Sequence, residues 1–494
     1  MKISVFSIQC SGGEGTAVSE GRDGGRARCP QRAGWVSVWF NGGLRTTRLT
    51  NLVALLCSVL LAAAETNKPV LLLFNYDNGA YLIDLPTALK LAGAQNLDVQ
   101  LARERLREAQ AQHDAALYNF FPWVAPGVAY RRHDGRIQDV GGTVFDASKQ
   151  HYALGANVEA RLELGEAWFK SLAAKQLAKA ADHAVEAQRQ ESVFNAAIGY
   201  FDLVKAHATM AVAQDAARVA GEYASQLQRG TELGLIFKGD TLRARGQAER
   251  NQLAVQQARE QQRVAAARLA QVLRLDPSVD LIPADNELLP LTLTPTNAAL
   301  DSLVAQALAT RPELKQGEAL AAAAQRSRDA ATVGPLVPNL GAQAFLGGLG
   351  GGRNNDMGNF GGTENMALTL GWRFGPGGLW DAPRRRTAEA RLAATTIATE
   401  KVKDDIIRQV VEAHTRTHSL AAQLATLKRA LATAEEAFRL TRARKERGIG
   451  VVMENIFAEQ ELTRARSDYV AAIAELNKAQ YTLQLARGGL GLGH

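Results

Sequence analysis

His414 and His418 are the residues whose spacing comes nearest to a recognised catalytic or metal-binding motif. Two histidines four apart on one helix can share a metal ion, but the H-E-x-x-H motif also requires a glutamate as general base, and none follows His414. No third ligand is evident. We interpret both as solvated helix residues, and an exported metal-dependent hydrolase is kept as a distant alternative.

Two further patterns give weaker signals for chemistry. The glycine run 347–352 lacks the Gly-Lys-Ser/Thr ending of a phosphate-binding loop, so we interpret it as part of a mobile loop over 347–363. After residue 64 the methionines are too few for a copper-binding ladder. The sequence therefore predicts no catalytic residue, no metal site, no cofactor and no enzymatic activity.

Long helices are the elements that carry most of these residues. Residues 166–233 contain no proline, and their apolar residues recur at steps of three and four. A single helix of this length spans about 100 Å, more than an ordinary domain core needs. The pattern indicates either a coiled coil in solvent or a rod that packs against partner helices.

An internal duplication relates the two halves of the chain. Gly234-Leu235 matches Gly448-Ile449 at an offset of 214 residues, and Asp240 matches Glu454. Residues 65–275 and 298–487 form the halves, a proline-rich linker occupies 276–297 and a tail occupies 488–494. Each half is predicted to contain helix, strand, loop, strand, long helix, tight turn and helix. In the first half these are helix 86–121, strands 123–130 and 151–164, helix 166–233, turn 234–239 and helix 240–274; in the second, helix 298–333 restarted by Pro312, strands 340–346 and 364–374, helix 380–447, turn 448–452 and helix 453–487.

Period-two alternation marks the strands. From Tyr152 to Leu164 every even position is apolar, while Asn157, Glu159 and Arg161 alternate with them. Charged residues inside the alternation need water, so the sheet either covers a soluble core or lines a wet lumen. Four strands cannot close a barrel, since about eight are needed, and a lumen would require an oligomer.

The N-terminus has the pattern of an export signal. Residues 52–64 are an apolar run that follows Arg45 and Arg48 and ends in an A-x-A form, so residues 1–64 are interpreted as an extension plus signal peptide cleaved after Ala64. We expect translation to start near Leu44. All three cysteines precede the cleavage point. Of the formal net charge of +7, only +3 lies after it, which gives no support to nucleic-acid binding.

The chain resembles the TolC-type outer-membrane efflux proteins over residues 82–487. The resemblance is carried by the two turn sequences that begin at Glu232 (ELGLIFKGDTLRAR) and Gly448 (GIGVVMENIFAEQEL), by Pro122 and Pro338 before the strands, and by the duplication. It implies a mainly α fold with a transmembrane β part. It also implies a homotrimer in the outer membrane of a Gram-negative bacterium, in which a 12-stranded β-barrel in contact with outer-membrane lipid continues as a helical periplasmic tunnel. An inner-membrane pump and a periplasmic adaptor complete such a tripartite efflux or type I secretion system.

The resemblance also implies roles for residues at the turns. Gly234, Leu235, Gly448 and Ile449 are expected to contact the adaptor. Asp240, Lys445, Glu454 and Phe457 are expected at the periplasmic gate, where we hypothesise a link between Asp240 and Lys445, a cation-favouring ring of Glu454 and an apolar constriction at Phe457. A secreted periplasmic coiled-coil scaffold without transport activity is the alternative function.

Overall fold

A computed structural model of the chain describes residues 76–77, 80–276, 278–285, 287–295, 298–354, 356–447 and 451–490. The predicted cleavage site, the three cysteines and the expected translation start lie outside these ranges. The elements are β1 (Tyr76–Asp77), β2 (Ala80–Ile83), α2 (Leu85–Gln95), α3 (Leu97–Tyr118), β3 (Trp123–Gln138), β4 (Val144–Leu162), α4 (Leu164–Glu232), α5 (Lys238–Leu273), β5 (Asp280–Pro283), α6 (Leu300–Thr310), α7 (Pro312–Thr332), η1 (Gly334–Leu336), β6 (Asn339–Arg353), β7 (Gly361–Gly371), α8 (Ala382–Glu446) and α9 (Val452–Ala486).

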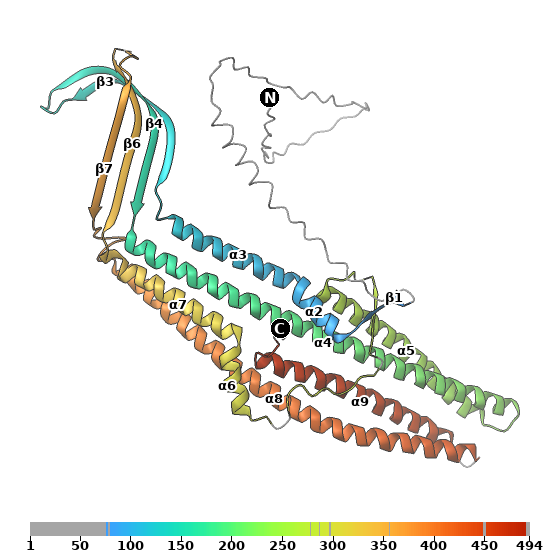
Figure 1. Ribbon diagram of the computed structural model, residues 1–494. Helices are drawn as coiled ribbons and strands as arrows, with labels where there is room; N and C mark the ends of the chain where they lie inside the picture. The colour runs from blue at the N-terminus through green and yellow to red at the C-terminus, as the bar shows by residue number, and fades with distance from the viewer. Residues whose placement is uncertain are drawn as a thin grey trace, which may run out of the picture. The chain divides into compact units, whose positions relative to one another are not determined.

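The two halves repeat one arrangement of helices. In the first half α3 and then α5 pack along the 69-residue α4; in the second, α7 and then α9 pack along the 65-residue α8. Because α4 also packs against α7 and α9, the halves lie side by side (Figure 1). Each half thus consists of one continuous helical rod and one broken one.

The predicted first helix, 86–121, is wrong as a single element because the chain breaks at Asn96. This residue has an extended backbone, and its side-chain oxygen accepts a hydrogen bond from the Asp98 N–H at 2.8 Å, which caps the start of α3. The corresponding break in the second half lies at Arg311, immediately before Pro312, where the sequence predicts it.

A four-stranded antiparallel sheet of order β3-β4-β6-β7 joins the helices at one end. Strands β3, β4 and β6 are longer than predicted, whereas β7 has the predicted length but begins and ends three residues earlier than the predicted 364–374. Most of the expected loop 131–150 belongs to β3 and β4, and the glycine run 347–352 belongs to β6, where close approach to β4 requires glycine. A Cβ on Gly347 would lie 2.3 Å from the Leu154 carbonyl oxygen, so glycine here serves strand packing and not loop mobility.

The linker contains structure that the sequence reading does not predict. Strand β5 pairs in parallel with β2, and β2 pairs with β1 in a small second sheet. The largest buried cluster adjoins it and includes Leu203, Leu269 and Leu281, each at most 1 % exposed. The Tyr200 hydroxyl donates to Asp285 at 2.6 Å, and burial together with this carboxylate raises the pKa of Tyr200.

The start of α4 is in close contact with the second half. A Cβ on Gly165 would lie 2.2 Å from the Gly334 carbonyl oxygen, a distance that only a shift of the backbone could relieve. Only glycine allows α4 and η1 to approach so closely.

Candidate functional site: the hairpin tips, the seam between them and the sheet

The α4–α5 hairpin ends in a tight turn at Gly234, whose φ is +74°. Its N–H donates to the Thr231 carbonyl at 2.9 Å, and the Leu235 N–H donates to the Gly230 carbonyl at 2.9 Å. This left-handed conformation favours glycine. The turn leaves apolar side chains in water, since Leu235 is 78 % exposed and Phe237 74 %.

At the α8–α9 tip, Gly448, Ile449 and Gly450 lie outside the described residues. An ion pair spans the turn, with Arg444 Nη1 2.9 Å from Glu454 Oε1. The Glu454 charge, which we expected to attract cations, is therefore compensated by Arg444 within the same chain. Phe457 is 58 % exposed.

The other two expected gate residues have different neighbours. The Asp240 carboxylate lies 3.2 Å from Arg243 Nη1 on its own helix, whereas Lys445 Nζ lies 3.3 Å from the centre of the Tyr223 ring. The Lys445 contact is a cation–π interaction between the two hairpins. Within the described residues, Asp240 and Lys445 do not pair with each other, and their link in an assembled channel stays a prediction.

A buried cluster holds the two tips together. Tyr223 and Leu227 from α4 and Ala244 from α5 pack against Ile456 from α9. Nearer to the α4–α5 turn, the Thr231 and Thr241 hydroxyls share a hydrogen bond of 2.6 Å. The tips therefore pack on each other through apolar side chains, while Leu235 and Phe237 at the α4–α5 turn stay exposed.

A polar seam continues between the hairpins, and the sequence reading did not find it. Glu459 on α9 is 6 % exposed, and its Oε1 accepts from Asn251 Nδ2 of α5 at 2.9 Å. The same amide donates to the Ala216 carbonyl of α4 at 3.1 Å, so Asn251 joins three helices. Glu459 interrupts a buried stripe formed by Ile456 and Leu462, and this interruption is the signal that could have identified the seam.

Charge at the seam is unevenly compensated. Arg466 Nη1 lies 2.8 Å from Asp215, and the guanidinium of Arg218, followed by that of Arg466, holds the pKa of Asp215 below its ordinary value. Burial, and to a smaller extent the nearby Asp215, raises the pKa of Glu459. Glu459 also lines a cavity of about 330 Å³ between α4, α8 and α9. Glu459 is thus a buried carboxylate at the hairpin interface that accepts a hydrogen bond from the Asn251 amide, and Arg218, Arg442 and Arg466 line the same cavity.

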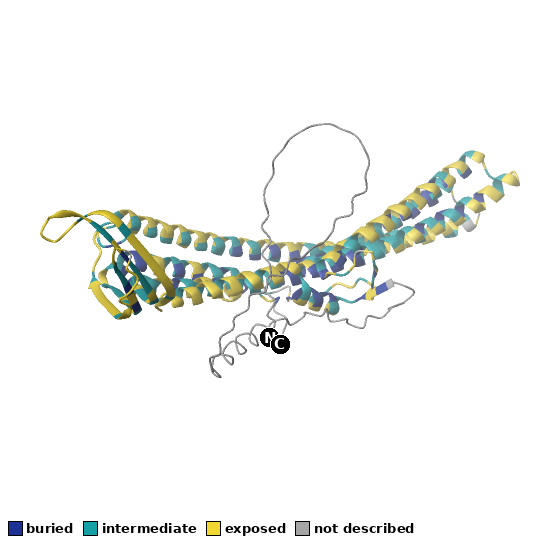
Figure 2. Cartoon of the chain, turned by 90° about the horizontal axis from the view of Figure 1, so that it is seen from above, coloured by how far each residue is buried: buried dark blue, intermediate teal, exposed yellow. Residues whose placement is uncertain are grey.

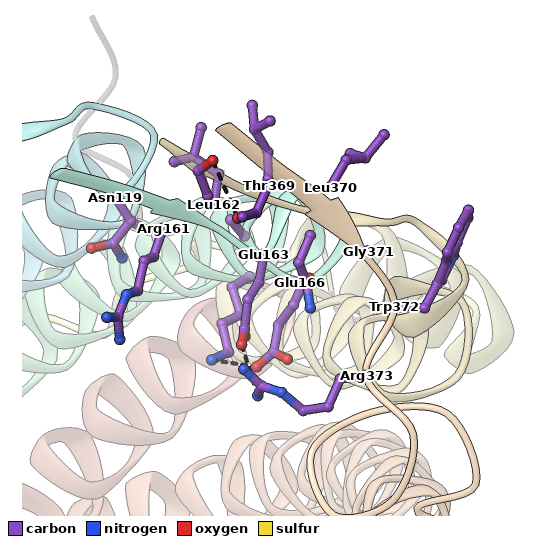
Figure 3. A pocket seen from close by; sticks show the side chains of 16 residues that line it. Asn119, Arg161, Leu162, Glu163, Glu166, Thr369, Leu370, Gly371, Trp372 and Arg373 are labelled. Carbon is purple, nitrogen blue, oxygen red and sulfur yellow. Dashed lines mark hydrogen bonds and ion pairs between the residues drawn. The ribbon is translucent and has the colours of Figure 1, made fainter. Parts of the chain in front are cut away.

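Salt bridges also hold the junction between helices and sheet. Figure 3 shows the Arg373 guanidinium reaching Glu163, with an N–O distance of 2.9 Å. Glu166, whose side chain is 13 % exposed, lies 2.7 Å from Arg384 Nη2 of α8 and 2.6 Å from Lys170 Nζ. Burial alone would raise the pKa of Glu166, but the hydrogen bonds from Arg384 and Lys170 outweigh it and lower that pKa. A cavity of about 740 Å³ adjoins these pairs.

The sheet has one polar and one apolar face, which follow from its register. We define the apolar face by the residues that share a side with Val128, Leu154 and Leu368; Val128 is 74 % exposed and Leu368 75 %. The polar face carries Asn157, Glu159, Arg161, Gln343 and Asn365. Cross-strand partners keep this division in the half of the sheet nearer the helices, whereas farther out Arg132 and Asp134 of β3 lie on the same side as Val128.

His414 and His418 lie on α8 with no sign of a metal centre. His414 is half-buried and His418 exposed. Within the described ranges, no group of three or more His, Cys, Asp or Glu side chains could hold a metal ion. No described helix is both long and apolar enough to cross a membrane.

A sheet with an exposed apolar face, mounted on duplicated helical rods, defines the class of an outer-membrane channel subunit. The family model described as outer membrane efflux protein matches residues 88–273 and 303–489, and the chain belongs to this family. The two matched segments correspond to the two halves. The family is one of channels and not a class of enzymes, and its members reside in the outer membrane of Gram-negative bacteria.

Individual relatives agree with this placement. The chain is 28 % identical to protein CyaE of Bordetella pertussis over 427 residues, which covers 82 % of this chain and 84 % of CyaE. The outer-membrane channel OprN matches with a TM-score of 0.71 and 21 % identity, over 82 % of this chain and 90 % of OprN. The CmeC outer-membrane channel of Campylobacter jejuni matches with a TM-score of 0.72 and 16 % identity, over 82 % and 85 % of the two chains.

Proposed function

We propose that three copies of this chain form the outer-membrane exit duct of a tripartite efflux or type I secretion system. The observation that carries the proposal is the sheet, whose apolar face is exposed and whose outer strands β3 and β7 each pair with only one neighbour among the described strands. Unpaired strand edges cannot remain in lipid, because no water is present to satisfy their N–H and C=O groups. Three four-stranded sheets joined edge to edge give twelve strands, enough to close around a lumen.

Strand direction supports this closure. β3 runs away from the helices and β7 runs toward them, so β7 of one copy beside β3 of the next continues the antiparallel order. The polar face then lines the lumen and the apolar face meets outer-membrane lipid. The helical rods below would extend the lumen through the periplasm.

The experiment is to purify the protein from outer membranes and add it to planar lipid bilayers. A duct gives discrete steps of current. A secreted coiled-coil scaffold gives none and remains in the soluble fraction without detergent, and that result would overturn the proposal.

We also propose that the hairpin tips receive a periplasmic adaptor connected to an inner-membrane pump. Leu235 and Phe237 are exposed apolar side chains at the outermost turn, and a partner that covers them would remove them from water. On this proposal Gly448 and Ile449 form the equivalent contact of the second half. Leu235→Asp should abolish capture of a periplasmic adaptor that is co-expressed with this protein and captured by the wild type, while Arg245→Asp, at an exposed α5 position, serves as the surface control. Equal capture by Leu235→Asp and wild type would refute the adaptor contact.

The gate is proposed to lie at the same tips. Asp240, Lys445, Glu454 and Phe457 come from both hairpins, so movement of one hairpin relative to the other would change their spacing in a trimer. Lys445→Ala should raise single-channel conductance by releasing the contact with Tyr223, whereas unchanged conductance would remove Lys445 from the gate.

A further inference from the structure

The outer end of the polar face carries a group of basic side chains that the proposed function does not explain. We call Arg131, His133, Lys149, His151 and Arg353 the outer basic cluster. The register places them together: Arg131 is opposite His151, and Lys149 is opposite both His133 and Arg353. Residues directly opposite on neighbouring strands share a face, and so do residues two apart on one strand.

This cluster lies at the end of the sheet away from the helices. β4 runs from Val144 to Leu162 and is followed directly by α4, so Lys149 lies near the end that is remote from the rods. Figure 1 shows β3 and β4 projecting at this end, and Figure 2 shows much of this hairpin as exposed. If the helices point into the periplasm, the cluster lies at the external mouth.

The basic side chains of the cluster lack ion pairs within the described part of the chain, where the Asp134 carboxylate interacts electrostatically with His133. Arg131, Lys149 and Arg353 are exposed, and no member of the cluster forms an ion pair with any described residue. The Nε2 atom of His133 is buried without a hydrogen-bond partner in the described chain. Like charges directly opposite in a sheet are destabilising, so this arrangement costs stability unless anions compensate it.

Several charges elsewhere on the sheet are paired within the same chain. On the opposite face of β3, Arg132 Nε lies 2.6 Å from Asp134, and Asp134 accepts from Ser148 Oγ at 2.5 Å. At the helix end of the polar face, Arg161 Nε lies 2.7 Å from Glu159. At the outer end of the face that would line the lumen, by contrast, the residues directly opposite Arg131, Lys149 and Arg353 are themselves basic.

We infer that the outer basic cluster forms an anion-attracting zone at the exit of the duct. The zone draws anionic cargo from the lumen toward the exit, and it binds polyvalent anions strongly enough for them to block the channel. The inference rests on the proposed trimer, in which three copies of the cluster surround one lumen. A narrow opening lined by one sign of charge between low-dielectric walls raises the local concentration of counter-ions. The cargo class it fits is small anions and acidic molecules that carry carboxylate or phosphate groups.

The test is block of the channel by inorganic triphosphate in planar bilayers at about 0.1 M salt, where the screening length is about 10 Å. Triphosphate is added separately to the side of the sheet and to the side of the helices. The wild-type protein is compared with the triple variant Arg131→Gln, Lys149→Gln, Arg353→Gln. The matched control is Arg132→Gln, which removes a charge from the neighbouring residue on the other face.

Triphosphate on the sheet side should block the wild-type protein and the control at the same concentration, and the triple variant should need at least about fivefold more. The conservative variant Arg131→Lys, Arg353→Lys keeps the charge and should keep the block. Each single Gln substitution acts in the same direction with a smaller effect, so the test remains available if the triple variant does not insert. A triple variant that differs from the control by less than this factor overturns the inference. Absence of channels from the wild-type protein would instead overturn the proposed duct.

Discussion

The buried carboxylate Glu459 gives the sharpest prediction about the hairpin seam. Glu459→Gln replaces it with a neutral side chain of nearly the same shape. The amide oxygen of glutamine can still accept from Asn251, and its N–H₂ group can donate to water in the cavity of about 330 Å³ that Glu459 lines. The substitution therefore removes a buried charge and keeps the hydrogen bond that joins α9 to α5.

The expected gain in the local stability of the tips is about 1–2 kcal/mol at neutral pH, the usual cost of a buried charged group with a single neutral donor. Because burial raises the Glu459 pKa, the folded state binds the proton more tightly than the unfolded state does. The contribution of Glu459 to stability is therefore fully present below the ordinary glutamate pKa and is lost as pH rises through the raised pKa. The advantage of Glu459→Gln should be largest at neutral pH and should disappear toward about pH 4.

Hydrogen exchange of the α9 amides around Glu459 measures this local stability directly. At pH 7.5 the variant should exchange about 5–30 times more slowly than the wild-type protein, as expected for a gain of this size. Glu461→Gln, two residues away and exposed, is the matched control and should exchange like wild type. Faster exchange in Glu459→Gln, or a gain that grows as pH falls, would refute the reasoning.

Three further predictions concern the packing of the two halves. Gly165→Ala should destabilise the protein by about 2 kcal/mol or more, because its Cβ would meet the Gly334 carbonyl at 2.2 Å; an unchanged melting temperature would contradict the close contact. Leu203→Ala, in a fully buried position, should cost about 2–5 kcal/mol, measured by the denaturant midpoint, and a loss below 1 kcal/mol would show that the site collapses or is not packed. Glu166→Gln should cost about 1–2 kcal/mol at neutral pH by weakening the link to Arg384. Since the Glu166 pKa is lowered, this contribution is present above the ordinary glutamate pKa and is lost as pH falls through the lowered one, so a cost that persists at pH 2 would contradict it.

The sequence predicts the helical part of the fold well because each signal there is local. Period, proline placement and the glycine turn at Gly234 indicate long helices in hairpins, and the repeat indicates two similar halves. The break at Asn96 was missed because an asparagine within a helical pattern can either continue the helix or cap the start of a new one. It became a cap only through the backbone conformation that follows α2.

The sheet and the linker were predicted less completely because pairing between distant segments decides them. Glycines 347–352 carry no strand signal of their own, and they extend β6 because β4 lies beside them. Strand β5 forms because β2, about 200 residues earlier in the chain, offers it a free edge. Local strand propensity predicts neither the pairing of β6 with β4 nor that of β5 with β2.

For the candidate site, the sequence indicated which residue types lie at the tips but not which side chains contact one another. Glu454 was expected to form a cation-favouring ring and Asp240 to link to Lys445, whereas within the chain Glu454 pairs with Arg444 and Asp240 with Arg243. Such pairs depend on side-chain direction across a turn or along a helix, which a motif match does not include. Glu459 was missed because its importance comes from burial between two hairpins.

The central claim is that three chains close one barrel through the free edges of β3 and β7. Interchain disulfides test this closure directly, and the three native cysteines, all before residue 64, lie in the segment expected to be removed. Ala129→Cys on β3 is combined in turn with a cysteine at each polar-face position of β7 from Thr363 to Thr369. The control pair Ala153→Cys, Leu349→Cys joins residues that are opposite each other within one chain. The account predicts that at least one β3–β7 pair gives covalent trimers upon oxidation in outer membranes, while the control gives only monomers. Failure of every β3–β7 pair to link chains, with the control pair oxidised within monomers, would contradict the closed trimeric barrel.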